Sequence, residues 1–135
     1  MNRVLTHRVR YHETDPQGFL FNSRYLELAD VAMTEYFRAL GLPYLELLEA
    51  GADPSVVSAQ LDFRRAALFE DVLVVAVGCT KVGRSSFTLD MSVTRAQETV
   101  ADIRLTYVNV DVGAAASRPL PEAVARRLHA DVRET

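Results

Sequence analysis

The spacing of hydrophobic and polar residues predicts that the chain begins with a β-strand. In residues 3–11, RVLTHRVRY, the side chains of Leu5, His7, Val9 and Tyr11 fall on one face and mostly polar residues fall on the other. Alternation with a period of two is typical of a strand with one buried face. We therefore expect a first strand over this segment.

A long helix is predicted after a turn. Pro16 and Gly18 mark the turn, and Asn22 or Ser23 can cap a helix that runs to about Leu40. Apolar residues recur along this helix at spacings of three and four, in a stripe wide enough to predict burial of most of its surface. They are Tyr25, Leu26, Leu28, Ala29, Ala32, Met33, Tyr36, Phe37 and Leu40. A shorter helix over residues 44–50 is expected to end at Gly51.

From Ser55 onwards the period is again two, which predicts four strands. The first carries Val57, Ala59, Leu61 and Phe63 on one face. Residues 72–82 are apolar on both faces, as expected of a central strand covered on each side. The remaining two strands span residues 86–94, with inward positions Phe87, Leu89, Met91 and Val93, and residues 99–111.

The chain is expected to end in a short helix that starts at Pro121, with Ala123, Val124 and Leu128 available for docking. The order of elements predicts an α+β fold with one antiparallel sheet and a helix on one face. A single helix covers only one face of a sheet. Because the strand over 72–82 is apolar on both faces, we expect a second copy of the chain to cover it, and so at least a dimer.

Composition narrows the class of protein. The 135 residues fit a single domain spanning 1–135, and 49% hydrophobic residues suffice for a packed core. The formal charge of −3 gives no general attraction to nucleic acid or to anionic membranes. The first residues lack the pattern of a secretory signal and no apolar run approaches the length of a membrane span, so a cytoplasmic protein is expected.

Several kinds of chemistry find no motif in the sequence. The only cysteine, Cys79, lies in the apolar run VLVVAVGCT and is expected to be a small buried hydrophobic residue. No Cys/His spacing suggests a metal site, so no metal ligands are assigned. A G-x-S-x-G nucleophile elbow, a Walker loop and a dinucleotide-binding fingerprint are also absent.

One segment resembles a known family signature. VRYHETDPQGFLFNSRYLELAD is similar to the signature of hotdog-fold thioesterases of the 4-hydroxybenzoyl-CoA thioesterase type, through Tyr11, Glu13, Thr14, Asp15, Gly18, Asn22 and Tyr25. The later segments DFRRAALFEDVL, VGRSSFTLDMSV and RPLPEAVARRL extend the resemblance over most of the chain. The sequence departs from the family at Ala66, where many relatives have Pro, and at Phe21, where Tyr or His is frequent.

The resemblance implies a hotdog fold, in which an antiparallel five-stranded sheet wraps around one long helix. Such proteins are typically dimers whose sheets join, often paired again into tetramers, with active sites between subunits. The implied enzyme is an acyl-CoA thioesterase, a hydrolase that converts acyl-CoA and water to a carboxylic acid and coenzyme A. Coenzyme A is then part of the substrate, and no separate cofactor is expected.

Asp15 allows two interpretations. From spacing alone it is a turn aspartate before a helix, because Asp-Pro favours turns and acids are common near helix starts. The resemblance instead implies a catalytic carboxylate, either the nucleophile or a general base that activates water. It also implies that the backbone N–H of Asn22, at the start of the long helix, polarises the thioester carbonyl.

The resemblance also implies residues that bind the substrate. Gly18 is a turn glycine that would let the loop approach the thioester, and Phe19, Phe21 and Tyr25 would line the acyl group. Basic and hydroxyl side chains suited to the phosphates of coenzyme A are Arg64, Arg65, Lys81, Arg84 and Ser85, although each is by default a solvated turn residue.

Three alternative functions stay open at this point. A thioesterase for acyl groups on a carrier protein would use the same chemistry. A hydratase or dehydratase would use a histidine with a carboxylate, and His12 and Asp15 are the only such close pair. His7 and His129 have no local partner in the sequence. A non-catalytic acyl-CoA binding module would have no need for a placed carboxylate.

Overall fold

The computed structural model describes residues 1–132. In chain order its elements are β1 (Asn2–Arg8), a 3₁₀ helix η1 (Tyr11–Glu13), α1 (Asn22–Ala39), α2 (Tyr44–Glu49), β2 (Pro54–Phe63), β3 (Val72–Val82), β4 (Ser86–Arg95), β5 (Glu98–Asp111), β6 (Ala116–Ser117) and α3 (Glu122–Ala130).

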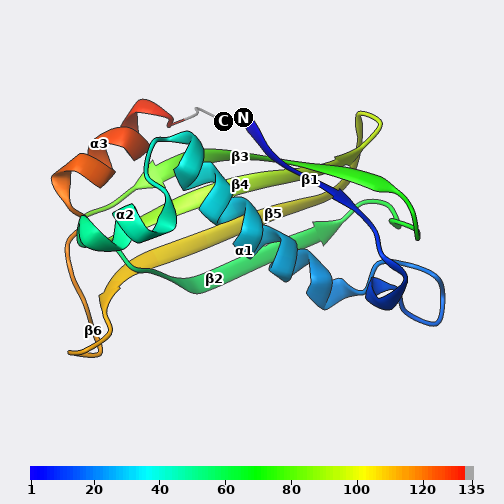
Figure 1. Ribbon diagram of the computed structural model, residues 1–135, viewed down its shortest axis with the longest axis horizontal. Helices are drawn as coiled ribbons and strands as arrows, with labels where there is room; N and C mark the ends of the chain where they lie inside the picture. The colour runs from blue at the N-terminus through cyan, green and yellow to red at the C-terminus, as the bar shows by residue number, and fades with distance from the viewer. Residues whose placement is uncertain (133–135) are drawn as a thin grey trace.

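The strands form one antiparallel sheet that curls around α1. Their order is β1-β3-β4-β5-β2, with the two-residue β6 paired to the end of β5. Figure 1 shows α1 crossing one face of the sheet, with α2 and α3 gathered at one end. This confirms the predicted α+β fold with five main strands around one long helix; β6 and the 3₁₀ helix η1 were not expected.

The core lies between α1 and the inner face of the sheet. The inward positions Phe87, Leu89, Met91 and Val93 of β4 are all buried, as their alternation predicts. α1 is less buried than its wide apolar stripe suggests, since only seven of its 18 residues are buried. Leu26 and Val31 on its other side are 41% and 46% exposed. The prediction of a helix buried on most of its surface is therefore wrong for the single chain, since the sheet covers only one side of it.

The first strand is shorter than predicted. β1 ends at Arg8, and Tyr11, expected to face inward with Leu5, His7 and Val9, lies in η1 and is 80% exposed. The chain leaves the sheet because the backbone N–H of Arg10 bonds to the Glu13 side chain at 2.7 Å instead of continuing a ladder.

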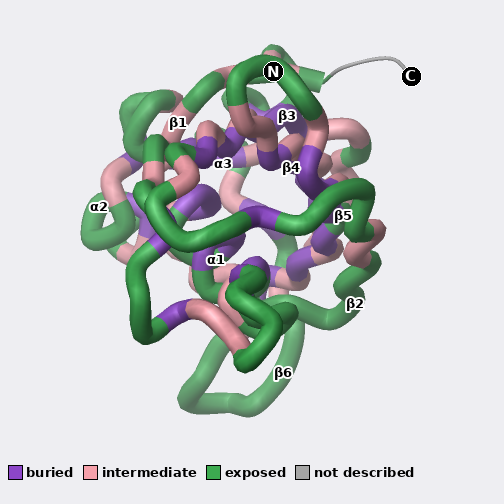
Figure 2. The backbone as a smooth tube through the Cα atoms, turned by 90° about the vertical axis from the view of Figure 1, so that its right-hand side faces the viewer, coloured by how far each residue is buried: buried purple, intermediate pink, exposed green. Residues whose placement is uncertain are grey.

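Strands β3 and β2 differ in cover. β3 lies between β1 and β4, and its residues Leu73, Val75, Val77 and Cys79 are buried, while the opposite face is only partly covered. β2 is an edge strand in which every residue is exposed or intermediate. Figure 2 shows this contrast between the buried inner strands and the exposed edge.

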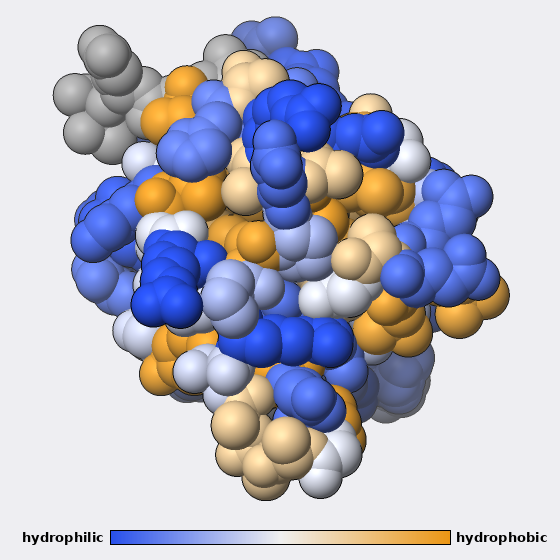
Figure 3. Space-filling view, turned by 90° about the vertical axis from the view of Figure 1, so that its left-hand side faces the viewer, coloured by the Kyte–Doolittle hydropathy of each residue, from blue (hydrophilic) through white to orange (hydrophobic). Residues whose placement is uncertain are grey.

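Side chains close the end of the sheet that carries α2 and α3. Asn109 is fully buried, accepts the backbone N–H of Asp53 at 2.8 Å, and donates to the carbonyls of Gly51 and Pro119 at 3.0 and 3.1 Å. α3 docks through the predicted Val124 and Leu128, whereas Ala123 is exposed because it faces away from the core. Figure 3 shows this end of the molecule, with hydrophilic side chains interspersed with smaller hydrophobic areas.

Candidate active site

The segment between η1 and α1 forms a small hairpin, residues 13–21. Thr14 and Leu20 form a bridge, the Asp15 N–H donates to the Phe19 carbonyl at 2.8 Å, and the Phe21 N–H donates to the Glu13 carbonyl at 2.9 Å. Gly18 turns the hairpin with a φ of 80°. Since Asp15 lies on one arm and Phe21 ends the other, the hairpin holds the acid beside the start of α1.

Asp15 is a turn residue in this hairpin, as its spacing suggests. Its Oδ1 accepts the backbone N–H groups of Gln17 at 2.9 Å and Phe19 at 3.2 Å. The carboxylate is therefore oriented by the backbone. A structural role in the turn and a chemical role are compatible, because a carboxylate has further lone pairs to offer.

The start of α1 differs from the expectation by one residue. The residue that flanks the helix is Phe21, in extended conformation and without a side-chain cap, and Asn22 is the first helical residue. The prediction that Asn22 or Ser23 caps the helix is therefore wrong; the bond from Phe21 to Glu13 fixes the entry of the chain instead. The first turn contains no acidic side chain, so its free N–H groups keep their partial positive charge.

A hollow of about 350 Å³ brings most of the expected site residues together. Its lining includes Asp15, Phe19, Phe21, Asn22, Tyr25, Arg64, Arg65 and also Phe63, which the sequence did not single out. Phe63 and Tyr25 meet edge to face, with ring centroids 5.1 Å apart. Gly18 is not part of the lining, and space is open around its Cα, so the structure supports its role in the turn.

The two arginines of this hollow carry ion pairs with β5. Arg64 Nε lies 3.0 Å from Asp102 and Arg65 Nε lies 3.3 Å from Glu98. All four side chains are substantially exposed, so these pairs hold the arginines weakly. An incoming phosphate can compete for the guanidinium groups.

The other expected phosphate ligands lie elsewhere in the chain. Arg84 and Ser85 line a separate hollow of about 220 Å³ together with Ser117 and Arg118. Lys81 lines neither hollow. Arg118 and Ser117 were missed because they precede Pro119 in a stretch that has no periodic pattern, and only the fold brings them beside Arg84.

Glu13 and His7 form a pair that the sequence did not reveal. The His7 Nε2 atom lies 2.8 Å from Glu13 Oε1, so the statement that His7 has no local partner is wrong. They are six positions apart in the sequence, and the turn at η1 brings the chain back. His12 is exposed, and among the contacts of the described residues none joins its ring to Asp15. The geometry thus gives no support to a His12–Asp15 acid–base pair.

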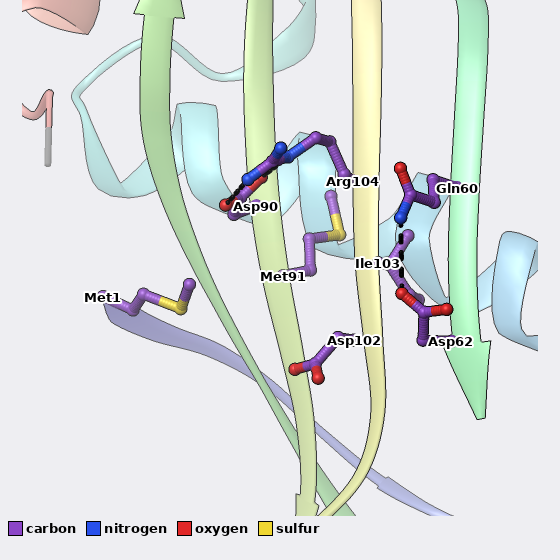
Figure 4. A pocket seen from close by; sticks show the side chains of 8 residues that line it. All are labelled: Met1, Gln60, Asp62, Asp90, Met91, Asp102, Ile103 and Arg104. Atoms are coloured by element: carbon purple, nitrogen blue, oxygen red, sulfur yellow. Dashed lines mark hydrogen bonds and ion pairs between the residues drawn. The ribbon is translucent and has the colours of Figure 1, made fainter. Parts of the chain in front are cut away.

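Other parts of the chain offer less chemistry. A hollow of about 260 Å³ on the sheet has a mixed lining in which most polar side chains pair with one another, as Figure 4 shows for Arg104 with Asp90 and for Gln60 with Asp62. Burial raises the pKa of the Cys79 thiol to about 11, as expected of an inert buried cysteine. Within residues 1–132, no group of His, Cys, Asp and Glu is placed to hold a metal ion, and no helix is long and apolar enough to cross a membrane.

A curled antiparallel sheet around one long helix is the hotdog fold. A family model described as the Thioesterase-like superfamily matches residues 9–128. The chain therefore belongs to the Thioesterase-like superfamily and is an enzyme of the thioester hydrolase class.

Named relatives and a solved structure agree with this assignment. The acyl-CoA thioesterase YbgC of Haemophilus influenzae is 28% identical over 123 residues, which cover 90% of this chain and 90% of that protein. A 1,4-dihydroxy-2-naphthoyl-CoA hydrolase of Nostoc punctiforme is 25% identical, over 99% of this chain and 91% of its own length. A thioesterase from Thermus thermophilus, in complex with coenzyme A and Zn, is 28% identical with a TM-score of 0.80, over 93% of this chain and 91% of that one.

Proposed function

We propose that the protein hydrolyses an acyl-CoA thioester, with Asp15 as nucleophile or general base and the Asn22 N–H as the group that polarises the carbonyl. The observation that carries this proposal is the hollow in which Asp15, the first residue of α1 and the aromatic residues Phe19, Phe21 and Tyr25 meet. Two relatives, an acyl-CoA thioesterase and a 1,4-dihydroxy-2-naphthoyl-CoA hydrolase, support the same substrate class.

The reaction follows from this arrangement. The carbonyl oxygen of the thioester lies against the free N–H groups at the start of α1, where negative charge is stabilised as the tetrahedral intermediate forms. Asp15 either attacks the carbonyl carbon, giving an anhydride that water then opens, or removes a proton from the attacking water. In both routes the carbon–sulfur bond breaks, one oxygen of water enters the acid product, and a proton reaches the coenzyme A thiolate.

The acyl group would lie against the aromatic residues of the hollow. Phe19 and Phe21 are 37% and 50% exposed, which leaves apolar surface free to contact a substrate. Phe21 stands where relatives often carry a polar side chain, Tyr or His, and it makes this wall of the hollow apolar. We therefore expect apolar or aromatic acyl groups to be preferred over charged ones.

The coenzyme A moiety would be held by two copies of the chain. β2 is an exposed edge strand in which Val56 and Val57 are 44% and 60% exposed, so antiparallel pairing with β2 of a second copy would bury them and satisfy its free backbone groups. A two-fold axis between the paired strands would bring the Arg84–Arg118 hollow of one copy to the Asp15 end of the other. The phosphates would then meet arginines of both copies.

Substitution of Asp15 tests the catalytic part of the proposal. In Asp15→Asn the amide oxygen still accepts the N–H groups of Gln17 and Phe19, so the turn is kept while the carboxylate is lost. We expect kcat on a panel of aromatic, short and long acyl-CoAs to fall roughly 10³-fold. The matched control is Asp111→Asn, because Asp111 also accepts a backbone N–H in an exposed turn, from Ala114 at 3.2 Å. A folded Asp15→Asn protein with near-full activity would refute the assignment.

Substrate truncation tests the binding part. Arg84→Ala and Arg118→Ala should raise KM for acyl-CoA about tenfold, and leave KM for the N-acetylcysteamine thioester of the same acid unchanged, because that substrate lacks the phosphates. Equal effects on both substrates would contradict the phosphate assignment.

Substitution at the exposed edge tests the pairing of two copies. Val57→Lys should convert a dimer to a monomer in analytical ultracentrifugation, with loss of activity.

A further inference from the structure

Glu13 is a buried carboxylate in a loop. With 9% exposure it is, together with Asn109, one of the two polar or charged residues that are buried in the described part of the chain. Burial of a carboxylate is unfavourable unless hydrogen bonds satisfy it. Here Oε1 accepts the Arg10 backbone N–H at 2.7 Å and meets His7 Nε2 at 2.8 Å. Burial opposes ionisation, but these two contacts outweigh it and lower the pKa of Glu13, so the carboxylate is charged at neutral pH.

The backbone of Glu13 is bound as firmly as its side chain. Its N–H donates to the Arg10 carbonyl at 3.0 Å, and its carbonyl accepts the Phe21 N–H at 2.9 Å. Phe21 directly precedes Asn22, and Asp15 follows Glu13 by two residues. Glu13 therefore joins β1, through His7, to the base of the hairpin that carries both groups of the proposed reaction.

The two arms of the hairpin have different anchors. The arm that leads to α1 is tied to the β2–β3 connection, because the Leu20 N–H donates to the Ala67 carbonyl at 2.8 Å and Phe19 bridges to Leu68. The arm that carries Asp15 has no such tie among the described contacts. Thr14 on this arm bonds back to the Tyr11 carbonyl within the same turn, and the link to β1 is the Glu13 side chain.

We propose that Glu13, held by His7 of β1, is a positioning residue that sets the placement of the Asp15 carboxylate relative to the start of α1. This inference rests on the proposed function, because it concerns how the acid and the N–H donors of that reaction are aligned. Loss of the Glu13 side chain removes the link of the Asp15 arm to β1 and leaves this arm held only by its bonds to the opposite arm. Misplacement of a reacting group by about 1 Å can cost on the order of 100-fold in rate.

Kinetics of Glu13 variants test the inference. Glu13→Ala should lower kcat about 100-fold while KM stays within about threefold, since the arginines and the aromatic wall are untouched. Glu13→Gln keeps an oxygen that can accept from Arg10 and from a neutral His7, so it should retain kcat to within about fivefold. The matched control is Glu35→Ala, which removes an exposed carboxylate of α1 that pairs with Arg38 at 3.1 Å.

Two kinetic results would overturn the inference. One is a Glu13→Ala protein whose melting temperature falls but whose kcat, counted per site that binds coenzyme A in calorimetry, equals that of the wild type; Glu13 would then be purely structural. The other is equal loss of kcat in Glu13→Ala and Glu13→Gln, because the Gln variant preserves the contacts that the inference needs.

Hydrogen exchange separates this inference from the proposed function. In Glu13→Ala the backbone N–H groups of Asp15 and Phe21 should exchange at least about tenfold faster, and in Glu13→Gln they should not. Unchanged exchange in Glu13→Ala overturns the positioning role whatever the activity. Wild-type protein that hydrolyses no acyl-CoA refutes the proposed function, and faster exchange in Glu13→Ala would in that case still show that Glu13 fixes the Asp15 arm.

Discussion

The two ends of the sheet are built differently. At the end with α2 and α3, here called the closed end, Asn109 and neighbouring side chains bind backbone groups of several loops, and Arg127 of α3 donates to the Leu40 carbonyl at 3.0 Å. At the end with the Asp15 hairpin, here called the open end, Phe19, Phe21 and Phe63 remain 37%, 50% and 48% exposed. One end therefore stabilises the fold, while the other leaves apolar and charged side chains exposed, as the proposed substrate site requires.

Strained backbone conformations are more frequent at the open end. Of the four non-glycine residues with positive φ in the described part of the chain, Glu70, Ala96 and Gln97 lie in turns at the open end, with φ of 76°, 49° and 71°, and only Ala115, with φ of 51°, lies at the closed end. Such conformations cost free energy for residues with a Cβ. The open end is therefore expected to be the less stable of the two, and the following substitutions test that difference.

The largest expected effect on stability is at the closed end. Asn109→Ala leaves the Asp53 N–H and the carbonyls of Gly51 and Pro119 without their partner in a buried site, which should cost about 3 kcal/mol of unfolding free energy. Urea denaturation of the variant measures this loss. A change below about 1 kcal/mol would show that the closed end is not held by this side chain.

The second effect is also at the closed end. Tyr36, on α1, donates its hydroxyl proton to Asp131 at 2.6 Å, directly beyond α3. Tyr36→Phe removes a charge-assisted hydrogen bond and should lower the unfolding free energy by about 2 kcal/mol. The same denaturation measurement checks it, with Tyr44→Phe as the exposed control, because that hydroxyl meets Asp53 at 3.2 Å near the surface.

Acid should affect the open end first. The pKa of Asp71 is lowered, like that of Glu13: burial opposes ionisation, but the Leu68 N–H and Arg95 outweigh it. A lowered folded-state pKa stabilises the fold above the ordinary pKa, near 4.5 for Glu13 and 3.8 for Asp71, and this contribution is lost as the pH falls through the folded value.

Hydrogen exchange between pH 6 and about pH 3 checks this order of events. Protection should decrease at Leu68 and Phe21 before it decreases at Asn109. The Glu13 carboxylate faces His7 and His12, and the Asp71 carboxylate faces Arg95, so protonation of either acid ends its electrostatic attraction to these groups. Simultaneous loss of protection at both ends would contradict the comparison.

The smallest effect is a gain at the open end. Ala96 and Gln97 form a two-residue turn between β4 and β5 in which both residues have positive φ, the conformation that favours Asn-Gly. Gln97→Gly should therefore raise the unfolding free energy by about 0.5 to 1 kcal/mol. Thermal denaturation is the measurement, and a destabilised variant would show that the Gln97 side chain makes a contribution of its own.

Much of the fold could be predicted from the sequence because its strands alternate cleanly. The inner face of β4 and the approximate ends of α1 follow from local periodicity, and the motif around Asp15 identified the loop of the candidate site. Periodicity could not show that β2 lies at the edge of the sheet, because burial depends on which strands become neighbours. For the same reason it placed Tyr11 inward, although the Glu13 side chain ends β1 before that residue.

The lining of the hollow at the candidate site was predicted in part. Asp15, Asn22, Phe19, Phe21 and Tyr25 lie within one short segment, so a motif suffices to bring them together. Phe63 and Arg118 reach their hollows only through the fold, and the pairing of His7 with Glu13 depends on a turn that closes between them. Residues that are neighbours in space but not in the chain leave no local pattern.

Cys79 is a natural probe of how often the core opens. It is the only thiol of the chain and is fully buried on β3, where its backbone N–H lies 3.4 Å from Asp131 just beyond α3. A thiol reagent can reach it only while the core is open. In the folded protein the raised pKa of the thiol also keeps it unreactive. The rate of its modification in native conditions therefore measures how often the closed end opens, and no probe residue has to be engineered into the chain.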